Sequence, residues 1–137
     1  MKHLLLLLAF CSGIFAQSFK CDKTALATTT TVGAIQVVAP DSDTTHKIRI
    51  CQVFMQVVQN TNSASDFGLV AGGSGGACAA NQVNVTQQWA GVANTIQGFT
   101  WNVDVNGVAL VDAGKALCLK LSNTVVSAKV MVFYGYF

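Results

Sequence analysis

The chain contains no glutamate, and this absence constrains its fold more than any other feature of the sequence. All six acidic residues are aspartates, and Arg49 is the single arginine among eight Lys and Arg residues. The surfaces of helical bundles depend on Glu, Lys and Arg, which are strong helix formers, so a helical bundle is a poor candidate. The polar surface must instead be built from Thr, Asn, Gln and Ser.

Runs of β-branched residues and apolar alternation predict strands along most of the chain. The expected strands cover residues 28–38, 47–58, 66–71, 83–86, 100–105, 108–111, 116–121 and 125–137. Turn signals separate these segments, and residues 87–94 are expected to form a short helix or a loop. The pattern predicts an all-β, antiparallel β-sandwich, and a jelly roll of about eight strands fits it best.

Two segments predict which side chains face the core. Leu117, Leu119 and Leu121 alternate with polar or small neighbours, so the three leucines should share one face. Trp101, Val103 and Val105 alternate in the same way with polar neighbours, so they should also share one face. This favours a core position for the Trp101 ring. The Asn-Gly pair at 106–107 predicts a tight hairpin turn, with residues 108–111 returning as the partner of 100–105.

The first sixteen residues have the three parts of a secretory signal peptide. A short basic start precedes the run Leu4–Leu8, and Ala16 supplies the small residue that signal peptidase needs. The apolar stretch is shorter than the roughly 20 residues of a membrane span. Lipidation at Cys11 would need a small residue before it, where the chain has Phe10. We therefore expect residues 1–16 to be a signal and residues 17–137 to form one β-sandwich domain.

Four cysteines remain after the expected cleavage: Cys21, Cys51, Cys78 and Cys118. An even number of cysteines in an exported chain predicts two disulfides, with three possible pairings that spacing alone leaves open. No two cysteines have the close spacing of a zinc site or a thioredoxin-type motif. Such a protein belongs in an oxidising location, in the periplasm, at the cell surface, outside the cell or in a virion.

The order of these features resembles small β-sandwich modules found among virion structural and appendage proteins of tailed phages and prophages. The resemblance runs from Cys21 to Phe137. It includes the segment Lys47–Cys51, the glycine-rich turn before Cys78, and the Val- and Tyr-rich last strand. It implies a single jelly-roll-like domain with a role in assembly or surface attachment.

Charge and titratable residues give little support to catalysis or nucleic-acid binding. The mature chain is nearly neutral and has no basic cluster, so we expect no nucleic-acid partner and no cofactor. Its one histidine, His46, could serve a hydrolase only with a nearby acid such as Asp43. Asp41 and Asp43 are weak calcium candidates, but two aspartates in a turn more often bind the local backbone. We expect no metal site and no enzymatic activity.

Aromatic and amide side chains suggest a ligand surface instead. Trp89 lies in a polar stretch, and Phe99, Asn94 and Gln97 follow it closely. Exposed aromatic side chains beside amides can bind a glycan or a protein. These four residues are therefore the candidate ligand-binding set.

The sequence thus predicts a non-enzymatic, exported or virion-associated structural or adhesion protein. It would act through assembly, as a homo-oligomer, and through binding to a cell-surface glycan or to a virion or envelope protein. We expect the bulky last strand to form a subunit interface, and we do not expect the mature domain in a membrane. The alternative is a small outer-membrane β-barrel, because the chain ends on an aromatic strand closing at Phe137. Against that alternative, strict alternation puts Gln52 and Gln56 on the same face as Ile50 and Phe54.

Overall fold

A computed structural model describes residues 21–74, 78, 81–102 and 109–137, with only the backbone described at 73, 74 and 109. The expected signal at 1–16, with Cys11, lies outside these residues. The described part has nine strands and no helix. They are β1 (Lys23–Thr29), β2 (Gly33–Val38), β3 (Ile48–Val58), β4 (Phe67–Ser74), β5 (Val83–Asn84), β6 (Ile96–Asn102), β7 (Ala109–Val111), β8 (Lys115–Leu121) and β9 (Ser127–Tyr136). Accordingly, no described residue belongs to a helix that is long and apolar enough to cross a membrane.

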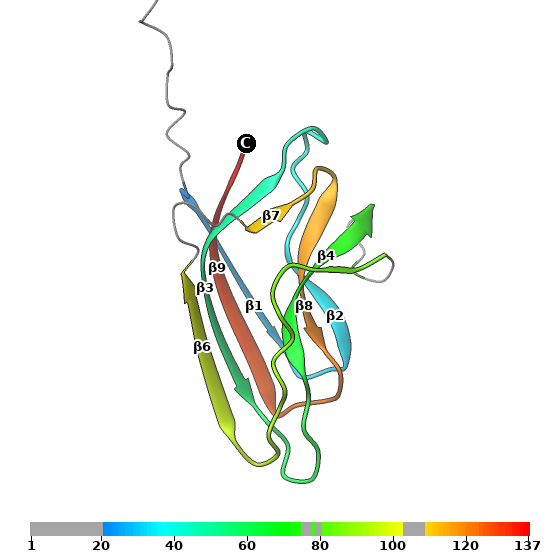
Figure 1. The fold of residues 1–137 in the computed structure, drawn as a ribbon, viewed down its shortest axis with the longest axis vertical. Helices are drawn as coiled ribbons and strands as arrows, with labels where there is room; N and C mark the ends of the chain where they lie inside the picture. Colours follow the sequence, from blue (N-terminus) through cyan, green and yellow to red (C-terminus); the bar gives the residue numbers. More distant parts are fainter. Residues whose placement is uncertain (1–20, 75–77, 79–80, 103–108) are drawn as a thin grey trace, which may run out of the picture.

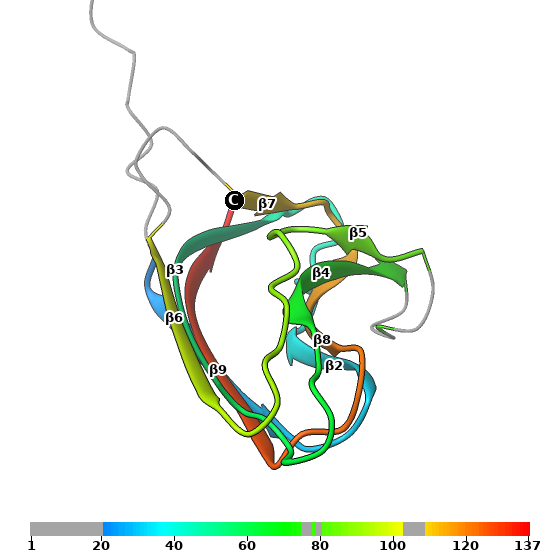
Figure 2. The same ribbon diagram turned by 60° about the horizontal axis from the view of Figure 1, so that its bottom comes forward.

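The strands form two antiparallel sheets that pack face to face (Figures 1 and 2). Sheet A has the order β1-β9-β3-β6, with β7 also beside β3, and sheet B has the order β2-β8-β4-β5. The chain crosses between the sheets at each step from β1 to β4, and the late strands β8 and β9 insert between the early ones. This strand order is that of a jelly roll, and it confirms the predicted β-sandwich.

The core lies between the inner faces of the two sheets. Leu117, Leu119 and Leu121 of β8 are all buried there, as their alternation predicted. They meet Phe67 and Leu69 of β4 and the inward side chains of sheet A. Each fully buried side chain of this size contributes about 1.5–3 kcal/mol to folding through the hydrophobic effect.

The single strand expected at 28–38 is instead two strands in different sheets. β1 ends at Thr29 and β2 begins at Gly33, which has a φ of 109°. Only glycine adopts this backbone conformation readily, so the chain can turn there and pass from sheet A to sheet B. The prediction was wrong because the residues on both sides of the turn are β-branched, and such a run is typical of one continuous strand.

A bulge at Cys51 changes which side chains of β3 face the core. Residue pairing with β9 shifts between Ile50 and Gln52. Ile50 therefore points inward, while Gln52 and Phe54 point outward, contrary to the strict alternation expected from the sequence. One extra residue in a strand reverses the faces of everything that follows it.

The described residues of β6 and β7 do not pair with each other as the expected hairpin requires. β6 pairs with the later half of β3 and β7 with its first three residues, both antiparallel. The two segments therefore run in the same direction along one edge, and β7 is not the return partner of β6. The turn predicted at Asn106–Gly107 lies outside the described residues, as do Val103 and Val105.

The last strand is central rather than peripheral. β9 lies between β1 and β3 and pairs with both along most of its length. The described strands form two separate sheets around a shared core, which is the arrangement of the predicted β-sandwich.

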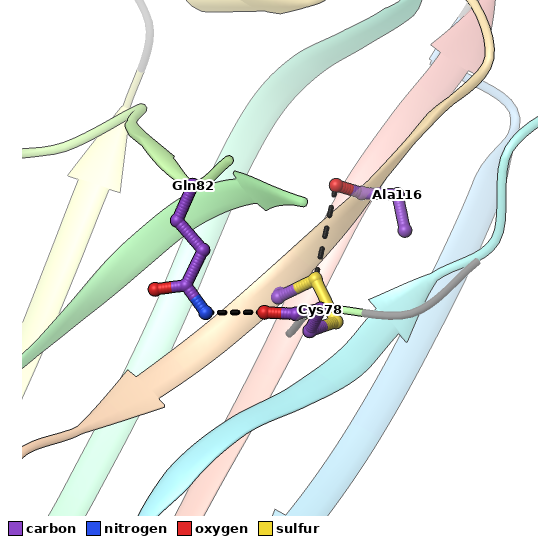
Figure 3. Close-up of a disulfide and its surroundings, with 4 residues drawn as sticks. Cys78, Gln82 and Ala116 are labelled. Atoms are coloured by element: carbon purple, nitrogen blue, oxygen red, sulfur yellow. Dashed lines mark hydrogen bonds between the residues drawn. A yellow bond between two sulfur atoms is a disulfide. The ribbon is translucent and has the colours of Figure 1, made fainter. Parts of the chain in front are cut away.

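The four cysteines form two pairs, Cys21–Cys51 and Cys78–Cys118, with Cα separations of 6.3 and 6.0 Å. The first joins Cys21, just before β1, to the bulge of β3. The second, shown in Figure 3, attaches the loop after β4 to the outward face of β8, where the Gln82 amide donates a hydrogen bond to the Cys78 carbonyl. Both pairs indicate an oxidising environment outside the cytoplasm.

Candidate functional site

Trp89 lies in the connection between β5 and β6, where it closes one side of the sandwich. Its backbone exchanges two hydrogen bonds with Phe67 of β4, at 2.8 and 3.0 Å. Its ring centroid is 6.0 Å from that of Phe67 and 4.9 Å from that of Phe99. Trp89 is thus half-buried and rigidly held rather than a free-standing surface platform.

The other three predicted ligand residues position this connection. Phe99 points inward from β6 and packs against Phe67 at 5.2 Å. The Gln97 amide oxygen accepts hydrogen bonds from Gln59 Nε2 and Val92 N, both at 3.1 Å, and its nitrogen donates to the Ala90 carbonyl at 3.2 Å.

Asn94 occupies a left-handed turn conformation with a φ of 57°, which asparagine tolerates well. Its backbone N–H donates to the Asn60 carbonyl at 2.8 Å. The hydrogen bonds of Gln97 and Asn94 therefore hold the loop that carries Trp89. Two of the four predicted residues line hollows in the described surface: Trp89 lines a cleft at this edge of the sandwich, and Phe99 lines a separate hollow on sheet A.

This cleft, of about 370 Å³, lies between the 85–89 segment and the edge strand β6. It is lined by Val85, Thr86, Gln87, Trp89 and Trp101. Trp101 packs partly against the core, as expected, but it also faces this cleft. Sequence reasoning missed Trp101 and Gln87 as site residues, because their proximity depends on the pairing of strands from two sheets.

The outward face of sheet A is a second candidate site. The pairing register places Leu26, Met131, Phe54 and Thr100 in one row across the four strands. Phe133 lies in the neighbouring row and meets Phe54 edge-to-face, with ring centroids 6.1 Å apart. We call Leu26, Phe54, Met131 and Phe133 the outer patch.

A shallow hollow of about 340 Å³ lies at the outer patch, and Leu26, Phe54 and Met131 help to line it. Gly98 contributes to it because a Cβ at that position would come no closer than 3.9 Å to another atom. Lys129 and Gln56 occupy the same row as Gly98. The face is therefore uneven, with the apolar outer patch set among uncharged polar side chains and Lys129.

The turn between β2 and β3 brings together the histidine and two aspartates. His46 Nδ1 lies 2.8 Å from Asp41 Oδ2, and His46 Nε2 lies 3.5 Å from Asp43 Oδ2. Asp43 also accepts hydrogen bonds from the backbone and hydroxyl of Thr45, at 2.9 and 2.7 Å. The aspartates therefore bind local groups, which is the interpretation that the sequence favoured.

The other contacts of the same turn are also local. Within the described ranges, no three His, Cys, Asp or Glu side chains gather into a group that could hold a metal. The Ser42 hydroxyl donates to Asp41 at 3.2 Å, whereas a serine nucleophile would need to bond to the histidine. The contacts support a structural role for His46.

We expect the turn contacts to depend on pH. The hydrogen bond to Asp41, with the nearby charge of Asp43, raises the pKa of His46 above its ordinary 6.5. The bond to His46 lowers the pKa of Asp41 below its ordinary 3.8, and bonds from Thr45 lower that of Asp43. The histidine contribution is complete below pH 6.5 and is lost as the pH rises through the raised value. The aspartate contributions are present above pH 3.8 and are lost as the pH falls through the lowered values.

An NMR pH titration of the His46 ring protons checks this expectation. The midpoint should lie above 6.5, and Asp41→Asn should move it back toward 6.5. Ser42→Ala, which removes only a neighbouring hydroxyl, should leave it nearly unchanged. A midpoint at or below 6.5 in the unaltered protein would contradict the predicted pairing.

Comparison of the sequence with known protein families and with curated proteins finds no match.

Proposed function

We propose that this protein is an exported, non-enzymatic structural or adhesion module that assembles with copies of itself and presents its loops to a surface. The observation that carries the proposal is the outer patch, four neighbouring apolar side chains on the solvent-facing side of sheet A. Leu26 at its edge is 71% exposed. Phe54, Met131 and Phe133 are partly exposed. Contiguous apolar side chains that reach solvent in this way mark interaction surfaces.

The composition of this face fits a protein interface. The three rows around the patch are Thr24–Phe133–Gln52–Asn102, Leu26–Met131–Phe54–Thr100 and Thr28–Lys129–Gln56–Gly98. All of these positions are described, and Lys129 is the one charged side chain among them. Interface centres are poor in charge and rich in Met and aromatic residues.

A second copy is the partner that we propose for this face. Four strands of seven residues cover roughly 24 by 19 Å, or about 450 Å² before side-chain relief is counted. A standard interface buries about 800 Å² on each partner, so we expect a dimer of moderate, micromolar affinity. Packing one face against the same face of a second copy requires a two-fold axis.

Replacement of Leu26 by lysine should abolish this dimer. Leu26 is so exposed that the fold should tolerate the change, whereas a charge buried without a partner in the interface is costly. Sedimentation velocity over about 1–200 µM should show a monomer–dimer equilibrium for the unaltered protein and a monomer for Leu26→Lys.

The matched control is Val83→Lys, since Val83 is 57% exposed but lies on β5 of the other sheet. It should dimerise like the unaltered protein. A protein that stays monomeric at the highest concentration, or a Leu26→Lys variant that still dimerises, would refute assembly through this face.

A place in a virion is the second candidate, and the strand order favours it. Jelly rolls with two Greek keys are common in viral capsid and lectin domains, both of which work by assembly or binding. The resemblance to phage structural modules agrees with this. Mass spectrometry of purified particles from the producing cells tests it, since a virion component should co-purify with the particles at fixed stoichiometry.

A further inference from the structure

We propose that the cleft between Trp89 and Trp101 binds one neutral sugar ring. The inference rests on the proposed binding role and adds the class of ligand. The volume of about 370 Å³ is at the lower end of the range for small-molecule sites, which suits a single ring. The site and the outer patch share no lining residue, so they can be tested separately.

The wall of the cleft is held in place before any ligand arrives. Val85 N and Thr86 N donate to the Leu69 carbonyl at 2.9 and 3.2 Å. The Thr86 hydroxyl accepts from Leu69 N and donates to the Gln87 carbonyl, both at 3.0 Å. With Trp89 bonded to Phe67, the 85–89 segment behaves as an added edge of sheet B. A preorganised site loses little entropy when it binds.

The chemistry of the lining residues selects the ligand. Tryptophan has an apolar ring body and one N–H donor, and a buried N–H normally finds a partner. No hydrogen bond joins the indole N–H of Trp89 or Trp101 to another described residue, and every buried side-chain donor in the described part has a partner. Both N–H groups are therefore available to a ligand.

Gln87 adds an exposed amide at the same opening. The described lining includes no Asp, Lys or Arg, so a neutral ligand is favoured over a nucleotide or a charged peptide. A sugar ring has apolar C–H faces that pack on an indole and hydroxyls that accept from N–H groups. It matches the two kinds of surface that the cleft offers.

The affinity for one ring should be weak, in the millimolar range, because so few atoms make contact. A dimer formed through the outer patch would carry two such clefts and would gain avidity on a glycan-bearing surface. This arrangement links the proposed assembly to the proposed ligand.

The two tryptophans are the only ones in the chain, so an NMR spectrum of the ¹⁵N-labelled protein contains one indole signal for each. The probes are glucose, galactose, N-acetylglucosamine and rhamnose, each titrated up to about 50 mM. We expect at least one sugar to shift both indole signals along a common saturation curve.

Adjacent glutamines provide a matched pair of variants. Gln87→Ala should weaken binding about fivefold, because it removes one hydrogen bond to the ligand. Gln88→Ala removes a neighbouring exposed side chain that does not line the cleft, and it should change the affinity less than about twofold. Both side chains lie outside the core, so both variants should fold.

Three results would overturn the sugar assignment. One is the absence of indole shifts with all four sugars, and another is equal weakening by the two glutamine variants. The third is saturation by N-acetylphenylalaninamide in place of the sugars, which would identify the cleft as a site for an apolar peptide side chain. Sedimentation of the same samples reports dimerisation independently, so failure of one proposal is distinguishable from failure of the other.

Discussion

Replacing Phe67 with alanine is expected to lower the free energy of unfolding by about 4 kcal/mol. Phe67 is fully buried on β4, and its ring contacts both Trp89 and Phe99. Alanine would leave a cavity at the point where the 85–89 segment meets both sheets, and the backbone pairing with Trp89 prevents the loop from collapsing into it. Urea unfolding, monitored by circular dichroism, measures the change. The slope of the unfolding free energy against urea concentration should be the same in both proteins.

Two variants make this expectation specific. Phe67→Leu should cost markedly less than alanine, because leucine fills much of the volume. Val83→Ala, at an exposed position of β5, should change the free energy by less than about 0.5 kcal/mol. A loss below about 1 kcal/mol in Phe67→Ala would mean that Phe67, Trp89 and Phe99 do not pack against one another.

Removal of the Cys78–Cys118 disulfide is expected to cost about 4 kcal/mol. The bond closes a loop with a sequence separation of 40 residues, so its loss frees a large part of the unfolded chain. The double variant Cys78→Ala/Cys118→Ala avoids a free thiol, and both side chains lie in the small buried cluster outside sheet B. Urea unfolding without reductant measures the effect, and a loss below about 1 kcal/mol would contradict it.

The other disulfide supplies the comparison. Cys21–Cys51 has a separation of 30 residues, so the double alanine variant should lose a similar free energy, about 3.7 kcal/mol. Reduction should differ, because Cys21 and Cys51 are half-buried whereas Cys78 and Cys118 are buried. Alkylation and mass spectrometry after mild reductant should find Cys21 and Cys51 labelled first.

Features that depend on neighbouring residues could be predicted from the sequence. The leucine alternation at 117, 119 and 121 identified a core face, because side chains in a strand always alternate. The long apolar run after Lys47 identified β3, and the four cysteines beyond the expected signal predicted two disulfides. The interpretation of Asp41 and Asp43 as turn residues also depended only on short-range hydrogen bonding.

The candidate sites depended on pairing that no local pattern contains. Trp101 lies on β6, at the edge of sheet A, and Trp89 lies on the 85–89 segment, at the edge of sheet B. The two residues meet because these two edges lie next to each other. The outer patch exists because the bulge at Cys51 turns Phe54 outward, beside Met131 of β9. The alternation of residues along a sequence predicts faces only for a regular strand, so it does not reveal a single extra residue.

The sequence by itself determined that this chain forms strands with one apolar face and carries, beyond the expected signal, four cysteines suited to two disulfides. These properties follow from side-chain chemistry and from the two-residue repeat of a strand. Only the tertiary structure decided which strands pair, which cysteines join, and which aromatic side chains meet at a surface. Those outcomes depend on contacts between residues far apart in the chain. The free energy of each such contact depends on how the two sheets pack together.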